Sequence, residues 1–235
     1  MDDLELRVAW ERHVSVDMQE FDAVLARHRE PHRMYHGARH VRWVVRHALQ
    51  LAARYTTTPS STTPSSTTPN STGQNARHVD IGAVTAAAFY HDAIYDPRAA
   101  DNEAASARLA TEVLTRSGWP PDRVDSVAAM IEATAGHDHV GSDADDGGDV
   151  STAVLLAADL AVLAADPPGY SAYVNGVRFE YSHVLDSDWV VGRSAVLQRF
   201  IDRDHIYPAV LDLVDWEARA RANITAELAA LKATS

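Results

Sequence analysis

The chain has 235 residues, of which 46% are hydrophobic and 23% are charged, so it can bury a sizeable core and is not composed like a disordered protein. Its net charge of −12 argues against a general nucleic-acid binder, which would present a basic surface. Cysteine is absent, which excludes disulfides, thiolate metal sites and a cysteine nucleophile. The first residues lack the basic start and apolar core of a signal peptide, and no stretch reaches the ~18 uninterrupted apolar residues of a membrane span. We therefore expect a cytoplasmic protein without membrane association.

Apolar side chains recur every three to four residues along most of the chain, which is typical of amphipathic helices, and no run alternates as a strand would. The sequence therefore predicts an all-α helical bundle that forms a single domain over 1–235. Two proline pairs, Pro120-Pro121 and Pro167-Pro168, are expected at helix starts. The predicted helices span roughly 3–28, 37–54, 79–94, 100–117, 121–135, 151–165, 170–186, 189–202 and 208–232.

Two segments depart from the helical pattern. Residues 56–75 are rich in Thr, Ser and Pro and contain no large apolar side chain, which predicts a flexible low-complexity insertion between two helices. We interpret it as a passive loop rather than as a functional tether or a domain boundary, because surface insertions cost little stability. Residues 138–149 are rich in Asp and Gly but lack the spacing of a calcium-binding loop, so we predict a solvated turn.

Histidine is frequent, with 12 residues, and its placement is more informative than its number. His36 and His40 lie four residues apart where a predicted helix opens, so both would project from one helical face. His91 and Asp92 are adjacent at the end of a strongly apolar helix. Each pattern alone has an ordinary explanation, since paired histidines also occur on solvated surfaces and a His-Asp dipeptide has little specificity.

Asp159 is harder to explain as a structural residue. It lies in the apolar run AVLLAADLAVLAA, and a buried carboxylate is costly unless it is paired or bound to a metal. His137, with His139 close by, follows the predicted helix 121–135. A histidine, a His-Asp doublet and a later buried aspartate on separate helices together form a specific combination.

The order His40, His91-Asp92, Asp159 resembles the HD superfamily of metal-dependent phosphohydrolases. The likeness extends over nearly the whole chain except the insertion, and is closest to a group of uncharacterised bacterial HD proteins. The segments that carry it are RMYHGARHVRWVV, AAFYHDAIYDPRAADNEAASARLA, AADLAVLAADPPGYSAYVNGVRFEY and RFIDRDHIYPAV. The resemblance implies an all-α bundle of the HD type in which these four residues bind a divalent metal at its centre.

Nitrogen and oxygen ligands without sulfur suit Mn, Fe, Co, Ni or Zn, and two histidines make Mg less natural. Four protein ligands would leave positions for water and a phosphate oxygen, so the ion would activate water and neutralise phosphoryl charge. His137 corresponds to a further histidine of two-metal superfamily members and is the candidate for a second metal, with Asp92 bridging. We expect one ion rather than two, because the other ligands of clear two-metal families are not all evident.

Further roles follow from related proteins. His36 resembles the proton-donating histidine of cyclic nucleotide phosphodiesterases, against the alternative of a capping or core role. By likeness to single-metal HD nucleotidases, Asp96 or Glu103 would orient the attacking water, although an acid in a first helical turn is also favoured by the helix dipole. Arg178 is the candidate phosphate clamp because a guanidinium offers a bidentate charged fork. The alternative for Arg178 is an ion pair with Glu180 or another acid.

The expected function is hydrolysis of a small phosphate ester or anhydride, with a nucleotide as the favoured substrate, by water that the metal activates. No nucleic-acid polymer is expected as a partner, and no covalent nucleophile is evident. The alternatives are non-hydrolytic HD proteins: a di-iron oxygenase, or a regulatory or binding domain that retains its metal.

Overall fold

The computed structural model describes residues 3–56, 79–137 and 150–233, and every regular element in these ranges is helical. This confirms the predicted all-α class. The predicted turn at 138–149 and all but the first residue of the insertion at 56–75 lie outside the described residues. The α-helices are α1 (Leu4–Ala9), α2 (Met18–Arg27), α3 (Ala38–Thr56), α4 (Ile81–Tyr90), α5 (Asn102–Arg116), α6 (Pro121–Ala133), α7 (Val150–Asp159), α8 (Pro167–Glu180), α9 (Asp186–Ile201) and α10 (Val214–Ala233). Shorter elements are the π-helix η1 (Trp10–Val14) and the 3-10 helices η3 (Leu160–Ala164) and η4 (Ala209–Leu211).

The single helix predicted over 3–28 is wrong, because the chain breaks between η1 and α2. Ser15 adopts a left-handed conformation with φ of 55°, which ends η1. Asp17 then caps α2 by accepting a hydrogen bond from the backbone N–H of Gln19 at 2.8 Å. The prolines at helix starts are confirmed, since α6 begins at Pro121 and α8 at Pro167. Because α8 begins there, it lies earlier than the predicted 170–186 and ends at Glu180.

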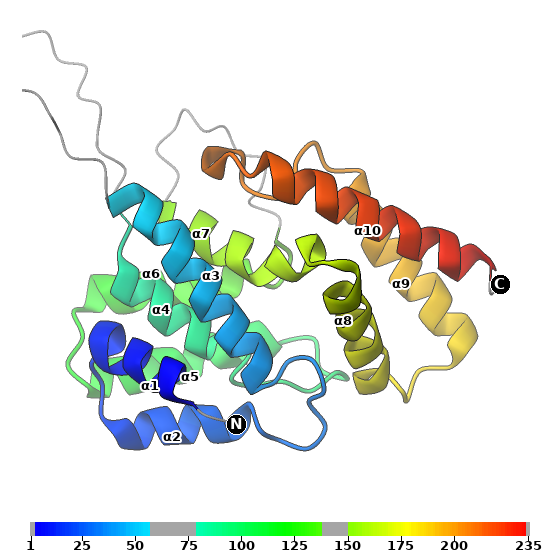
Figure 1. Cartoon of the computed structure of the whole chain (residues 1–235). Helices are drawn as coiled ribbons and strands as arrows, with labels where there is room; N and C mark the ends of the chain where they lie inside the picture. The colour runs from blue at the N-terminus through cyan, green and yellow to red at the C-terminus, as the bar shows by residue number, and fades with distance from the viewer. Residues whose placement is uncertain (1–2, 57–78, 138–149, 234–235) are drawn as a thin grey trace, which may run out of the picture.

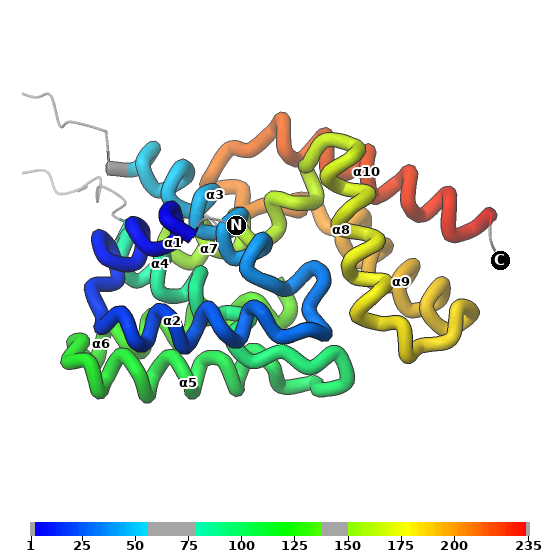
Figure 2. Tube along the Cα trace, turned by 60° about the horizontal axis from the view of Figure 1, so that its bottom comes forward, coloured from blue at the N-terminus to red at the C-terminus, as the bar shows by residue number. Residues whose placement is uncertain are grey.

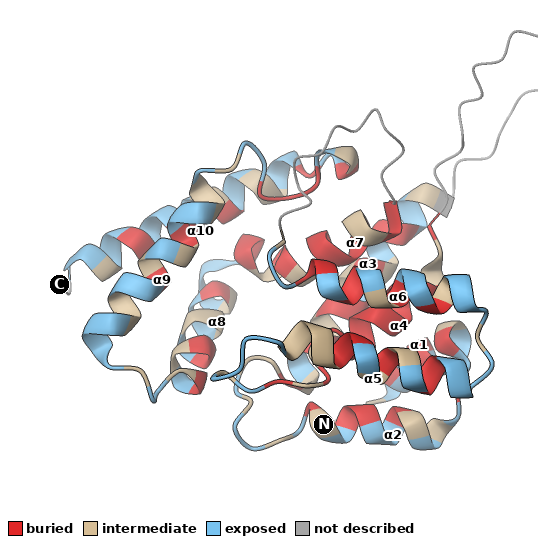
Figure 3. Cartoon of the chain, turned by 180° about the vertical axis from the view of Figure 1, so that it is seen from behind, coloured by how far each residue is buried: buried red, intermediate tan, exposed pale blue. Residues whose placement is uncertain are grey.

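Helix α4 forms the centre of the bundle. All of its residues from Gly82 to Tyr90 are buried, as the red colour of α4 in Figure 3 shows. It packs against η1, α3, α6 and α7. A helix that is apolar on every side is stable only when other elements surround it, which explains why the sequence of α4 shows no polar face.

The helices form two groups with α7 and η3 running between them (Figure 1, Figure 2). Helices α1 to α6 lie on one side of the molecule, and α8, α9 and α10 lie on the other. Helix α7 contacts α3 and α4, whereas η3 contacts α8 and α10. Asp159 is the last residue of α7, so it lies where the two groups meet.

No single helix in the described ranges has the length and apolar character needed to cross a membrane. The pair formed by α7–η3 and α8 passes that test only when taken together, and it is bent by 103°.

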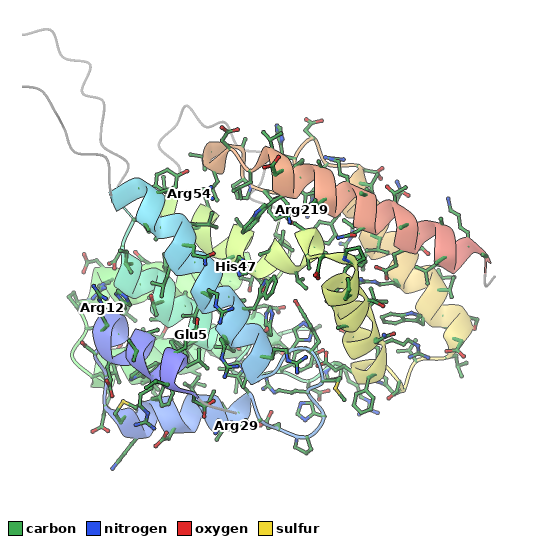
Figure 4. The ribbon with its side chains drawn as sticks, in the orientation of Figure 1. Glu5, Arg12, Arg29, His47, Arg54 and Arg219 are labelled. Carbon is green, nitrogen blue, oxygen red and sulfur yellow. The ribbon has the colours of Figure 1, made fainter. Side chains whose placement is uncertain are left out.

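Helix α3 is held from both ends of the chain. Arg46 donates two hydrogen bonds to the Glu5 carboxylate of α1, at 2.8 and 2.6 Å. One residue later, the ring of His47 packs edge-on against Trp216 of α10, with centroids 5.5 Å apart. Figure 4 labels Glu5 and His47 on these elements. These contacts fix the helix that carries His40.

Candidate metal centre

Three predicted side chains come together where α3, α4 and α7 meet. His40 is in the first turn of α3, His91 directly follows α4, and Asp159 ends α7. The His40 Nε2 atom is 3.1 Å from both His91 Nε2 and Asp159 Oδ1, and His91 Nε2 is 3.4 Å from the same Asp159 oxygen. These residues form a group that could hold a metal ion, with both imidazoles buried.

The fourth predicted ligand, Asp92, presents its carboxylate to the same two imidazoles. Its Oδ2 atom is 3.2 Å from His91 Nε2 and 3.4 Å from His40 Nε2. The side chains of Asp92 and Asp159 are 14% and 12% exposed, against 2% and 1% for His40 and His91. The group is therefore enclosed on its imidazole side and partly open to solvent on its carboxylate side.

The end of α4 explains how a polar doublet reaches the interior. The helix begins at a cap in which the Asp80 carboxylate accepts the backbone N–H of Ala83, and its apolar residues then carry the chain through the core to His91. The last carbonyls of a helix carry partial negative charge, which favours a cation near them. The site thus combines the C-terminal end of a buried helix with two carboxylates.

Charges within the group shift its titration strongly. Burial alone would lower the pKa of His91, but the Asp92 and Asp159 carboxylates outweigh it and hold that pKa well above its ordinary value. Burial alone would raise the pKa of each carboxyl, but the positive charge of His91 and hydrogen bonds from the neighbouring imidazoles hold both well below their ordinary range. The group therefore attracts positive charge, whether protons or a cation that displaces them.

The ring nitrogens also fit a metal. The Ala88 carbonyl lies 3.0 Å from His91 Nδ1 and can only accept, so Nδ1 carries the proton and Nε2 faces the group. His40 Nδ1 is buried and has no hydrogen-bond partner among the described residues, so Nε2 is the nitrogen that this ring offers. Two Nε2 atoms at 3.1 Å cannot both present lone pairs to each other without a proton or cation between them. Two nitrogens and two carboxylates are a donor set that first-row divalent ions accept.

His137 lies beside Asp159 rather than beside Asp92. Its Nε2 atom is 2.9 Å from Asp159 Oδ2, and the residue has a left-handed backbone with φ of 52° just after α6. Arg203 holds it there by donating to the His137 carbonyl at 3.0 Å and to the Gly136 carbonyl at 2.9 Å. His139 lies outside the described residues.

His36 lies in the turn two residues before α3, so it does not share a helical face with His40 as predicted. The two rings are nevertheless neighbours, with centroids 5.7 Å apart. The Nδ1 atom of His36 is 2.6 Å from Glu180 Oε2, and its side chain is 23% exposed. Burial alone would raise the pKa of Asp92, but His91 and His40 lower it and the charge of His36 adds a smaller lowering effect. His36 thus lies beside the candidate metal ligands, in the turn that precedes α3.

The two acids predicted to orient water have different surroundings. Asp96 is exposed, and its carboxylate accepts the backbone N–H of Arg98 at 2.9 Å in a local turn. Glu103 is partly buried in the first turn of α5. Burial, followed by the charges of Glu180 and Glu103, raises the pKa of Tyr181. A catalytic role stays a prediction for both acids.

Arg178 is occupied by the chain that follows α8. Its guanidinium donates to the Tyr181 carbonyl at 2.8 Å, to the Val184 carbonyl at 3.2 Å and to the Asp186 carboxylate. The cation also lies 5.3 Å from the ring centroid of Trp189. The ion-pair alternative therefore describes its contacts, with Asp186 in place of Glu180 as the acid.

Sequence reasoning missed two residues that support the site. Arg33 is 1% exposed in its side chain and donates to the Asp92 carbonyl at 2.6 Å and to the Ala93 carbonyl at 3.1 Å. Glu180 is buried and receives the His36 imidazole. Neither stands out in the sequence, because Arg33 is one of 21 basic residues and Glu180 follows a helical pattern like many surface acids.

No family model matches the chain, and comparison with curated proteins and with solved structures finds no significant match.

Proposed function

We propose that this protein is a metal-dependent phosphohydrolase of the HD type that acts on a small phosphate ester or anhydride, with nucleotides as the first class to test. The observation that carries the proposal is the convergence of His40, His91 and Asp159, with Asp92 beside them, in one group whose carboxylate side is partly open. Such a donor set suits Mn, Fe, Co, Ni or Zn better than Mg. A divalent cation on these ligands would acidify a water molecule and neutralise charge on a phosphoryl group.

The residues around the group have separate roles in this proposal. His36 donates a proton to the leaving oxygen from Nε2, because its Nδ1 is used by Glu180. Glu103 suits the orientation of water better than Asp96, whose carboxylate already holds the Arg98 N–H. A phosphate would have to displace Tyr181, Val184 and Asp186 from Arg178, so we assign that arginine a minor role in substrate binding.

The alternative from another class is a di-iron oxygenase that uses His137 in a second metal site. The observation that supports this alternative is the hydrogen bond between His137 and Asp159. We prefer hydrolysis with one ion because, in the described part of the chain, the only group of three metal-ligating side chains found together is His40, His91 and Asp159.

Metal analysis of the purified protein, combined with a screen of phosphorylated metabolites, tests the proposal. Wild type should bind close to one equivalent of transition metal and should melt at a lower temperature after chelation, since the ligands tie α3, α4 and α7 together. Asp92→Ala should lose metal and turnover. The matched control is Asp96→Ala, an exposed aspartate four residues later that should keep the metal.

Hydrolysis in oxygen-18 water identifies the bond that breaks. Attack at phosphorus places the label in the released phosphate-bearing product. Label in the alcohol fragment alone would exclude this mechanism, and oxygen consumption would favour the oxygenase. Metal binding without turnover of any phosphorylated compound would indicate a regulatory or binding domain.

A further inference from the structure

The side chain of Glu180, at the end of α8, holds the turn that contains His36. One carboxylate oxygen, Oε1, accepts the backbone N–H groups of Met34, Tyr35 and His36 at 2.8, 2.7 and 2.9 Å. The other, Oε2, is 2.6 Å from His36 Nδ1 and accepts the Tyr95 hydroxyl at 2.9 Å. Five hydrogen bonds to one carboxylate with 0% side-chain exposure are more than a simple loop cap requires.

The charge state of Glu180 follows from these contacts. Burial alone would raise its pKa, but the hydrogen bond and charge of His36 and the backbone N–H groups of Tyr35 and His36 hold the pKa below its ordinary value. An ionised carboxylate can only accept hydrogen bonds, so His36 must carry its proton on Nδ1. The neutral ring therefore has its lone pair on Nε2, and the charged ring carries its second proton there.

The ring of His36 is also held on its faces and edges. Tyr95 stacks on it with centroids 4.4 Å apart and an interplanar angle of 28°, while Tyr35 packs edge-on at 4.8 Å. Tyr95 thus contacts both His36 and the carboxylate that orients it. The ring has one defined plane and one defined nitrogen with which to exchange a proton.

Helix α8 is shaped for this contact. Gly176 lies one turn before Glu180, on the same face of the helix, and a Cβ atom there would come 3.0 Å from Tyr35 Cβ and 3.4 Å from Tyr35 N. Because glycine has no Cβ atom, the backbone of the turn can approach α8 closely enough for all three N–H groups to reach Oε1. Helix α8 in turn packs against η3, which directly follows Asp159.

We propose that Glu180 is a positioning residue that fixes His36 as its Nδ1–H tautomer and aims Nε2 at the leaving group of the substrate. The catalytic role of His36 in this inference rests on the proposed function. The orientation of its ring by Glu180 does not, because it can be observed in the metal-free protein. A histidine that donates from Nε2 does so as the charged ring, and the Glu180 carboxylate stabilises that ring by accepting its Nδ1–H. The Nε2–H tautomer turns a lone pair toward its partner at Nδ1 and loses this stabilisation.

Nitrogen-15 NMR of metal-free protein, at a pH where the ring is neutral, tests the tautomer directly. The His36 signals are assigned by their loss in His36→Gln. Wild type should show a protonated Nδ1 and a bare Nε2, and the Nε2–H tautomer in wild type would overturn the proposal without any need for a variant.

Glu180→Gln replaces one acceptor oxygen with an amide that donates. If the Gln oxygen keeps the three backbone N–H groups, its NH2 faces His36 Nδ1, so the ring should switch to the Nε2–H form. Tyr95→Phe is the matched control, because it removes one hydrogen bond to the same carboxylate oxygen and should keep the wild-type tautomer. An unchanged tautomer in folded Glu180→Gln would overturn the proposal.

With a substrate in hand, Glu180→Gln should lower kcat by about 10²–10⁴-fold, the range expected for losing a general acid, with little change in KM. A rise in KM at constant kcat would overturn the positioning role. Because the tautomer is read without metal or substrate, absence of hydrolysis would overturn the proposed function alone. A wrong tautomer in an active enzyme would overturn only this inference.

Discussion

Asp159 divides its carboxylate between two sets of partners, and His137 is the partner of the second oxygen. The Oδ1 atom is 3.1 Å from His40 Nε2, whereas Oδ2 is 2.9 Å from His137 Nε2. A ligand oxygen is oriented by what its partner oxygen binds, so His137 sets the direction in which Asp159 presents Oδ1.

Removal of this orienting contact should weaken the metal site without abolishing it. We expect His137→Ala to lower metal affinity by about 10–100-fold, the usual effect of losing an outer hydrogen-bond partner. Competition with a metal indicator measures the affinity, and His205→Ala, at an exposed histidine, is the control. A fall from two bound equivalents to one would instead make His137 the ligand of a second ion.

Arg33 should contribute to stability through the carbonyl groups that it holds. Its guanidinium donates to the backbone of His36, Asp92 and Ala93 while its side chain is buried. We expect Arg33→Ala to reduce the free energy of unfolding by about 2–4 kcal/mol, since buried carbonyls lose their donors. Urea denaturation of the metal-free proteins measures the loss. Arg39→Ala, at an exposed arginine, should stay within about 0.5 kcal/mol of wild type, and equal losses in both variants would contradict the assignment.

Three of the four candidate metal ligands could be named from the sequence because their polarity conflicts with their surroundings, whereas His40 was named from the resemblance. Asp159 lies in AVLLAADLAVLAA and His91-Asp92 follows AAAFY, so burial of these polar groups without partners would be costly. This conflict can be recognised from the sequence alone. Their convergence in space could be expected only from the resemblance, since 51 residues separate His40 from His91.

Glu180 and Arg33 could not be recognised in this way. Glu180 binds residues 144–146 positions earlier, and Arg33 binds backbone carbonyls about 60 positions later. Partners so distant in sequence leave no pattern near either residue.

The break at Ser15 could not be predicted for a different reason. The apolar periodicity continues across it, and a left-handed serine carries no helix-stop signal such as glycine.

Gly176 should be required for the close contact between α8 and the His36 turn. Alanine normally stabilises a helix relative to glycine by about 0.5–1 kcal/mol. At position 176, however, the alanine Cβ would come 3.0 Å from Tyr35 Cβ. Tyr35 cannot move away easily, because its backbone N–H donates to Glu180 Oε1 at 2.7 Å. We therefore expect Gly176→Ala to lower the free energy of unfolding despite the better helix propensity.

Gly192 on α9 provides the matched control, because a Cβ there would meet nothing within 4 Å. Gly192→Ala should gain about 0.5–1 kcal/mol from helix propensity alone. Thermal or urea denaturation compares the two variants. If both alanines stabilise the protein equally, the turn at Tyr35 is able to yield and α8 does not fix it.

His28 should make the metal-free protein less stable in mild acid. The ring is 2% exposed, its Nε2 donates to the Phe89 carbonyl at 2.9 Å, and burial lowers its pKa to about 3 although that hydrogen bond partly offsets the effect. In the unfolded chain, the His28 ring should bind a proton with its ordinary pKa of about 6.5. The buried ring of the folded chain does not bind a proton at that pH. Stability from this residue is therefore complete above about pH 6.5 and is lost as the pH falls toward 3.

The expected loss is about 1.4 kcal/mol for each pH unit below 6.5, or about 2 kcal/mol at pH 5. His28→Gln retains an N–H donor for the Phe89 carbonyl but cannot titrate, so its free energy of unfolding should fall less steeply between pH 7 and pH 5 than that of wild type. His183→Gln, at an exposed histidine, should keep the wild-type slope. Chelator is present throughout, so that proton competition for the metal ligands is the same in all three proteins. Parallel curves for wild type and His28→Gln would mean that His28 accepts its proton in the folded chain, and the buried neutral ring would then be the wrong description of this position.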